Sequence, residues 1–227
     1  GSLGSFNMPM PEGVTIRQVV DACAHQARWT NESYVSPPSK YLRRGRGFAC
    51  AMKNVGFSFG FPEECWAKIE LHGSSEIERV ILYNAGADVG QGAHTAMVQM
   101  TAEAVGVPPH KISLEVADTE KTGNAGSASA SRMTFMSGHA IIGAATVALQ
   151  QWRDEERPAV GAYRFEPRRT SALDPHTGEC DPNITYGYVA EYVEVEVDTE
   201  TGHIRVTNVI CADDVGKVIN RQQVEGQ

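Results

Sequence analysis

The stretch Glu78–Val105, ERVILYNAGADVGQGAHTAMVQMTAEAV, decides the fold of this chain. It opens with an apolar run over Glu78–Tyr83, which favours a β-strand. Glycines then punctuate Asn84–Gly92, which predicts a loop. The remainder predicts an α-helix, because small and apolar residues recur at helical spacing, at Ala93, Met97, Met100 and Ala104. Strand, loop and helix in this order predict one unit of a mixed α and β architecture.

A second strand–loop–helix unit follows directly. The pair Pro108-Pro109 ends the first helix, and Lys111–Ala117 alternates as a strand. Thr119–Ser131 is a run of small and polar residues without periodicity. Met133–Trp152 is the longest helix candidate, and because it is apolar almost all round we expect it to be deeply buried.

Hairpins are predicted on both sides of these units. Cys65–Leu71 pairs with Glu78–Tyr83 through a short polar turn. Near the end of the chain, Tyr186–Val197 has valines at alternate positions, and a second apolar strand returns after residues 198–202. The predicted fold class is therefore α+β, with mixed sheets, hairpins and two buried strand–loop–helix units.

The rest of the chain is less regular. Val14–Trp29 has helical spacing with Thr15 as N-cap, and residues 31–40 form a linker. Gly47–Phe61 contains one charge among glycines, alanines and aromatics, so we expect an extended and largely buried segment. Asp154–Asn183 carries four prolines and little periodicity, which indicates an excursion or a mobile region.

The predicted domain organisation has three parts. Gly1–Ser5 has the composition of a cloning scar, so residues 1–13 are interpreted as that scar and a flexible start. Residues 14–43 are an N-terminal helix and linker. Residues 44–227 form one domain, which we expect to be truncated at its C-terminus.

Composition excludes several classes of function. The 227 residues carry a formal net charge of −8, which argues against a nucleic-acid-binding surface. A single basic cluster, Arg43, Arg44 and Arg46, is either a solvated loop edge or a patch for an anion or partner. The five cysteines are scattered, so they predict a reducing, cytoplasmic location and neither a zinc nor an iron–sulfur site. No apolar run is long enough to cross a membrane.

The first loop that could carry chemistry is Asp88–Thr95. Gly90 and Gly92 allow a close approach of backbone to a ligand, and the following helix offers N–H groups at its positive end. Gln91 presents both an amide donor and an acceptor. The alternative is a tight turn with a surface glutamine.

A second loop, Ser127–Thr134, leads into the long helix. Its closely spaced hydroxyls and small residues at a helix N-terminus suit an anion the size of a phosphate. The alternative is ordinary N-capping by Ser129 or Ser131, which needs only one hydroxyl.

A third loop, Asp213–Asn220, is followed by Val224–Gln227. Its two adjacent acids could bind a hard cation or a ligand, or could cap a turn. His94 and His139 have no metal-ligand partner at helical spacing, so we interpret both as hydrogen-bonded histidines. The chain has no nucleophile elbow and no P-loop lysine.

Taken together and in this order, the motifs resemble the molybdopterin-binding region of the xanthine dehydrogenase and aldehyde oxidase family of molybdenum hydroxylases, from about Arg44 to Gln227. Joint order and spacing, rather than any single motif, carry the resemblance. The motifs are Gly45–Gly47, Asp88–Gly92 with Thr95 and Gln99, Ala102-Glu103, Asp118-Thr119, Ala130–Thr134 with Gly138–Ala140, Val195–Gly202, Asp214–Gly216, Ile219-Asn220 and Gly226-Gln227.

The resemblance implies a set of cofactor-binding residues and no direct protein ligand to the metal. Gln91, between Gly90 and Gly92, matches a glutamine that hydrogen-bonds an oxygen on molybdenum. Gln227 matches a glutamine that contacts the pterin. The segment that cradles the pterin's phosphate and ring matches Ser129, Ala130, Ser131, Met133 and Thr134. The implied cofactor is a molybdenum–pterin, either molybdopterin or its cytosine dinucleotide.

The resemblance also implies an activity that this chain would not perform alone. The family hydroxylates heteroaromatic, purine-like compounds or aldehydes with oxygen from water, and passes electrons to iron–sulfur clusters and FAD on other domains or subunits. Its general-base glutamate lies in a Gly-Glu-Pro loop expected downstream of Gln227, and Glu225 does not match it. We therefore expect no catalytic residue here, and partnership with the remainder of a large subunit and with iron–sulfur and flavin subunits. The alternatives are a non-catalytic assembly module and a domain for another phosphorylated ligand.

Overall fold

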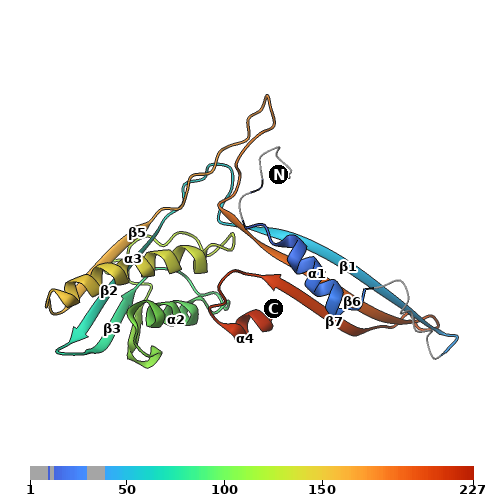
Figure 1. Ribbon diagram of the computed structural model, residues 1–227, viewed down its shortest axis with the longest axis horizontal. Coiled ribbons are helices and arrows are strands. Elements are labelled where there is room, and N and C mark those ends of the chain that lie inside the picture. The colour runs from blue at the N-terminus through green and yellow to red at the C-terminus, as the bar shows by residue number, and fades with distance from the viewer. Residues whose placement is uncertain (1–9, 11–12, 30–38) are drawn as a thin grey trace. The chain divides into compact units, whose positions relative to one another are not determined.

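The computed structural model describes residue 10, residues 13–29 and residues 39–227 (Figure 1). The predicted cloning scar and most of the predicted linker lie outside the described residues. Within them, helices and mixed sheets confirm the α+β class. No helix in this part of the chain is long and apolar enough to cross a membrane.

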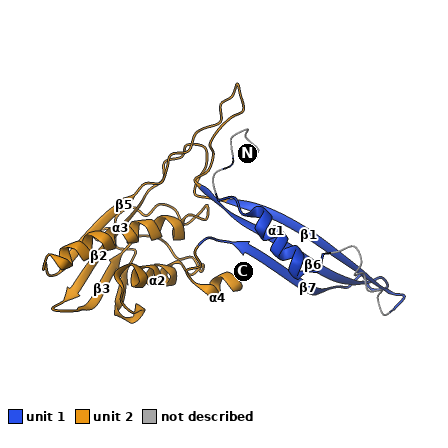
Figure 2. Ribbon diagram, in the orientation of Figure 1, with its two compact units in different colours: residues 1–4, 9–53, 185–216 blue, residues 5–8, 54–184, 217–227 orange. Residues whose placement is uncertain are grey.

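The chain forms two compact units, coloured separately in Figure 2. One contains the described residues of Pro9–Lys53 together with Thr185–Gly216. The other contains Asn54–Ile184 and Lys217–Gln227. These boundaries differ from the predicted division into 14–43 and 44–227, because the N-terminal helix packs on strands from the far end of the sequence.

The second unit is built on a four-stranded sheet of order β4-β3-β2-β5. The predicted hairpin is present as antiparallel β2 (Cys65–Gly73) and β3 (Ile77–Tyr83). β4 (Ile112–Glu115) runs parallel to β3, and β5 (Ala159–Phe165) runs antiparallel to β2. Parallel neighbours need a crossover connection, and α2 supplies it between β3 and β4.

Both predicted helices of this unit are confirmed. α2 (Ala93–Val105) ends where Gly106 adopts a left-handed φ of +80° and its N–H donates to the carbonyl of Ala102. A short 3₁₀ turn, η1 (Pro109–Lys111), then leads into β4. α3 (Met133–Arg153) packs against β2, β5 and α2.

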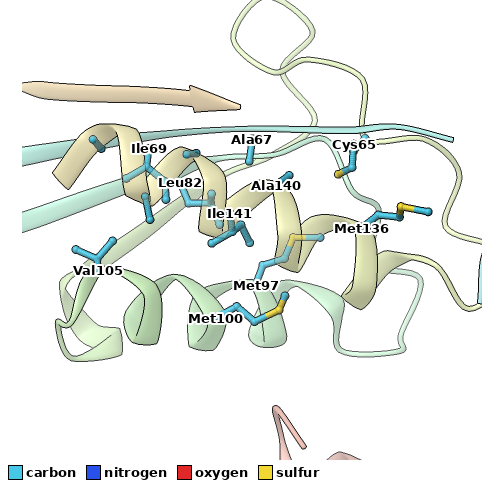
Figure 3. Packing of buried hydrophobic residues seen from close by; sticks show 14 of the residues in the cluster. Cys65, Ala67, Ile69, Leu82, Met97, Met100, Val105, Met136, Ala140 and Ile141 are labelled. Atoms are coloured by element: carbon cyan, nitrogen blue, oxygen red, sulfur yellow. The ribbon is translucent and has the colours of Figure 1, made fainter. Parts of the chain in front are cut away.

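The core of this unit lies between the sheet and the two helices (Figure 3). Alternate residues of β2 point into it and are fully buried, at Cys65, Ala67, Ile69 and Leu71. The helices contribute Met97, Met136 and Ile141. At Gly161 an added Cβ would lie 3.0 Å from the Cβ of Ala148 and closer still to the backbone of α3, so only glycine lets the helix rest on β5.

The first unit is a three-stranded sheet of order β1-β6-β7 with one helix on it. Its strands are β1 (Leu42–Val55), β6 (Thr185–Asp198) and β7 (Ile204–Asp214), and the predicted β6–β7 hairpin is confirmed. α1 (Ile16–Gln26) buries Val19 and Cys23 against Tyr188, Ala190 and Tyr192.

A buried carboxylate ties the three strands of this unit together. Glu196 of β6 has a side chain only 6% exposed, and it forms ion pairs with Arg44 Nε at 3.0 Å and Arg205 Nη2 at 2.6 Å. These partners, Arg205 foremost, lower the pKa of the Glu196 carboxyl. The basic cluster Arg43, Arg44 and Arg46 thus lies on strand β1 and not on a solvated loop edge.

Three sequence predictions were wrong about burial or regularity. Gly47–Phe61 was expected to be largely buried, but β1 is an edge strand and is mostly exposed, with Met52 at 47%. α3 was expected to be buried all round, yet it packs on one side only and exposes Ile142 at 56%. The predicted irregular loop of residues 154–183 contains β5, which lacks apolar alternation because glycine and alanine face the helix.

Candidate functional site

Two loops lie at one edge of the sheet in the second unit. Residues 84–92 follow the carboxyl end of β3, and residues 116–132 follow the carboxyl end of its parallel neighbour β4. Open sheets place ligands at such carboxyl ends. The loops adjoin, because a Cβ added to Gly86 would lie 3.0 Å from the sulfur of Met133 at the start of α3.

A fully buried asparagine anchors the first loop. The Asn84 side-chain amide donates to the carbonyl of Trp66 at 2.9 Å, and its Oδ1 accepts from the N–H of Gly86 at 2.8 Å. Its own N–H donates to the carbonyl of Glu115. Asn84 thus joins three segments, and its role was not predicted because a lone Asn after a strand also fits an ordinary loop.

Asp88 binds several N–H groups around the start of α2. Asp88 Oδ1 accepts from the N–H of Gly90 at 2.9 Å and of Gly92 at 3.2 Å, and its Oδ2 accepts from His94 at 3.1 Å. These bonds, Gly90 foremost, lower the pKa of the Asp88 carboxyl. The protein's own carboxylate therefore places a negative charge at the positive end of this helix and binds one of its N–H groups.

Gln91 is exposed at the tip of the same loop. Its Oε1 accepts from the N–H of Val89 at 2.6 Å, and its Nε2 donates to the carbonyl of Ala87 at 3.0 Å. The side chain stiffens the loop and keeps one amide hydrogen and one lone pair for another group.

The second loop has a different balance of donors and acceptors. The carbonyls of Ala125 and Ser127 accept from Arg132 Nη1 at 2.7 and 3.0 Å, and the carbonyl of Ala130 accepts from the N–H of Gly56 at 2.8 Å. Among the described residues, no acceptor meets the N–H groups of residues 127–131 or 133–135. Unpaired N–H groups at a helix start are the kind of donor set that binds anions in other proteins.

The predicted residues of this loop lie on its surface, with one exception. Ser129, Ser131 and Thr134 are exposed, whereas the side chain of Met133 is buried in the core. Ala130 and Ser131 both have left-handed φ values, +55° and +54°, which is strained for residues other than glycine. The N-cap of α3 is Arg132 with no side-chain cap bond, so the capping alternative for the serines does not hold.

The C-terminal segment reaches the first loop through Gln223. In α4 (Arg221–Glu225) the side-chain amide of Gln223 donates to the carbonyl of Gly92 at 3.3 Å, and a Cβ added to Gly92 would clash with it. Asn220 caps this helix by accepting from the N–H of Gln223 at 3.1 Å. The pattern Asn220-x-x-Gln223 is a capping-box signature that could have indicated this residue. Gln227 is exposed, and its N–H donates to the carbonyl of Val224.

A cavity of about 860 Å³ borders the second loop. Gly126, Ser127 and Arg132 form one wall of it. The rest of its lining comes from Phe57, Gly60–Glu64, Asn124, Glu166–Thr170 and Ile184, so it carries charges of both signs. The cavity was not predicted, because residues 166–170 come from the segment expected to be irregular.

The remaining candidates are structural. Asp214 accepts from the Thr15 hydroxyl and from the N–H of Gly216 at 2.9 Å, so it caps a turn. The His94 ring bonds the carbonyl of Gly86 at 2.9 Å, and His139 stacks on Phe165. In the described part of the chain, no cluster of His, Cys, Asp and Glu could hold a metal ion.

Comparisons with known proteins agree on one family. A family model described as the molybdopterin cofactor-binding domain matches residues 22–161 and 146–227. A protein of Bacillus subtilis named as a probable xanthine dehydrogenase component is 28% identical over 82% of this chain and 29% of its own length. A xanthine dehydrogenase of Drosophila pseudoobscura is 26% identical over 100% of this chain and 18% of its own.

Among solved structures, the aldehyde oxidoreductase of Desulfovibrio desulfuricans superposes with a TM-score of 0.84 at 26% identity. The match covers 100% of this chain and 26% of that one. The chain thus spans less than a third of the length of each of these relatives.

Proposed function

The chain belongs to the molybdopterin cofactor-binding domain family, and on that premise we propose that it forms part of the protein wall around a molybdenum–pterin cofactor in a hydroxylase. The observation that carries the proposal is the loop Ser127–Thr134: apart from Arg132, its N–H groups have no acceptor among the described residues, while the carbonyls of Ser127, Ser129 and Ala130 are bound by the protein. A pterin cofactor of this kind carries a phosphate, and such a loop suits that group.

The residues of the loop fit a phosphate in three respects. Its side chains are small, so the backbone can approach an anion closely. Ser129, Ser131 and Thr134 add exposed hydroxyl donors. Ala130 and Met133 would contribute through their N–H groups, because the side chain of Met133 is committed to the core.

The first loop would hold a polar but uncharged part of the cofactor. Gly90 and Gly92 allow close approach, and Gln91 has amide hydrogen-bonding capacity to spare toward an oxygen on the metal or a ring nitrogen. We add Gln223 to this part of the site, because it contacts Gly92, and keep Gln227 as a proposed contact of the pterin.

The proposed reaction is oxidation of an aldehyde or a heteroaromatic, purine-like substrate, supported by the names of the relatives that the chain matches. When bound, the molybdenum–pterin group supplies the redox chemistry, and this chain's residues bind and orient it. No side chain here is proposed as acid or base. The proposed partners are the rest of a large subunit and iron–sulfur and flavin domains or subunits. The proposed location is cytoplasmic, and the five free cysteines support a reducing compartment.

The test is metal and ligand analysis of the full-length gene product, purified from a host that makes the molybdenum cofactor. We expect molybdenum and a phosphate-bearing pterin in near-equal amounts with protein, and substrate oxidation that depends on them. A protein with another phosphorylated ligand and no molybdenum would refute the hydroxylase and keep the phosphate loop. Retention of neither would favour a non-catalytic assembly module.

A further inference from the structure

We propose that Arg132 is a positioning residue for the phosphate loop. Its guanidinium binds two of the loop's carbonyl oxygens, and this leaves the N–H groups of residues 127–131, 133 and 134 available to an anion. The inference rests on the proposed function and adds the residue that would fix the orientation of the loop's peptide groups.

Arg132 is almost completely buried, with a side chain 1% exposed. Its Nη1 donates to the carbonyls of Ala125 and Ser127 at 2.7 and 3.0 Å, and its Nη2 donates to the carbonyl of Glu64 at 2.6 Å. Its Nε forms an ion pair at 2.5 Å with Glu63, which is itself 4% exposed. One side chain therefore connects the loop to the segment that precedes β2.

This set of contacts requires a guanidinium. Its donors form a rigid planar fork, so several fixed oxygens on different sides can be bound at once. A lysine ammonium is a single point charge and could reach only part of the set. Because Glu63 compensates the charge, Arg132 is expected to act on an anion through the loop and not by direct attraction.

The backbone around Arg132 has its carbonyl groups bound by protein donors, as this role requires. The carbonyl of Ser129 accepts from the N–H of Arg132 itself, and that of Ala130 accepts from Gly56. With these and the two side-chain bonds, four carbonyls between residues 125 and 130 are held by protein donors. A peptide group cannot rotate without breaking such a bond, so the opposing N–H groups stay in one orientation.

Gly126 offers an independent way to disturb the guanidinium. A Cβ at this position would lie 2.6 Å from Arg132 Cζ, so Gly126→Ala displaces the side chain without removing it. Gly126 has a φ of +70° and Gly178 one of +71°, but Gly178 has nothing within 4 Å of an added Cβ. Gly178→Ala is therefore a matched control for backbone strain.

The experiment is a titration of the full 227-residue chain with inorganic phosphate, followed by nitrogen-15 NMR of the loop amides, with chloride at equal ionic strength as reference. We expect phosphate to shift the signals of residues 127–134 in the wild type. Arg132→Lys and Gly126→Ala should each weaken this binding about tenfold, the equivalent of one hydrogen bond to a charged group. Gly178→Ala should bind as the wild type does.

The outcomes separate the inference from the proposed function. A purely structural role for Arg132 predicts a lower melting temperature with unchanged phosphate affinity in the folded protein. If the wild-type loop responds and both variants keep its affinity, the role of Arg132 is overturned and the phosphate loop stands. If the wild-type loop does not respond, both fail. Should Arg132→Lys not fold, as judged by the spectrum, Gly126→Ala decides.

Discussion

Replacement of Asn84 should destabilise the second unit strongly and specifically. Asn84→Ala removes the donor to the Trp66 carbonyl and the acceptor of the Gly86 N–H, both in a fully buried setting. Each buried group left without a partner costs about 1–3 kcal/mol. We therefore expect a loss of about 2–6 kcal/mol in the free energy of unfolding of this unit.

Tryptophan fluorescence during urea unfolding measures this loss. Trp66 and Trp152 lie in the second unit and Trp29 in the first, so a Trp29→Phe background reports on the second unit alone. With a urea m-value of about 2 kcal/mol/M, the midpoint should fall by about 1–3 M. The control is Gln222→Ala, an exposed amide in the same unit, which should change stability by less than about 0.5 kcal/mol.

A second substitution tests the donor alone. Asn84→Asp keeps an oxygen for Gly86 but places a charge opposite the Trp66 carbonyl in a buried site. Burial raises the pKa of such a carboxyl, so the penalty should be present at pH 7 and should shrink as the pH falls through the raised folded pKa and the acid becomes a donor. A midpoint for Asn84→Ala within about 0.3 M of wild type, or an Asn84→Asp deficit that does not vary with pH, would refute the reasoning.

Three further predictions concern the packing and the charges. Gly161→Ala should cost about 1–3 kcal/mol in urea unfolding, because its Cβ meets the backbone of α3, whereas the exposed neighbour Ala162→Ser should be nearly neutral. Because the pKa of Glu196 is lowered in the folded protein, its ion pairs stabilise the first unit at neutral pH, and this stabilisation is lost as the pH falls below 4.5. Glu196→Gln should therefore flatten the acid unfolding transition measured by the fluorescence of Trp29. An unchanged transition would contradict this. Cys50 and Cys211 both belong to exposed residues, but Cys50 should react faster with a disulfide reagent at pH 8. Partial desolvation of the Cys211 thiol foremost, together with its bond to Glu191, raises the pKa of Cys211 to about 12. Peptide mapping by mass spectrometry that finds Cys211 labelled first would contradict this.

The local parts of the fold could be read from the sequence. The helix over Ala93–Val105 was predicted with its observed bounds, because apolar spacing and a following proline pair act within a few residues. β5 could not be found in the same way. Its identity depends on Gly161 fitting under α3, and pairing with β2 gives no signal in its own alternation.

In the candidate site, too, local features could be predicted from the sequence and long-range contacts could not. Glycines and serines indicated both loops, since they report local backbone requirements. The ion pair of Arg132 with Glu63 joins residues 69 positions apart, so no local pattern could predict it. The capture of the α2 N–H groups by Asp88 is local, and an Asp two residues before a glycine is a turn signal that could have predicted it.

The internal cap made by Asp88 has a consequence for ligand orientation. Two helix starts lie at the same end of the sheet, and only the start of α2 has a carboxylate of the chain, Asp88, bound to it through the N–H of His94. At the start of α3 the N–H groups of residues 133–135 have no acceptor among the described residues. An elongated molecule that is anionic at one end only can satisfy both loops in one direction and not in the reverse. We therefore expect the two loops to accept such a ligand in one orientation only.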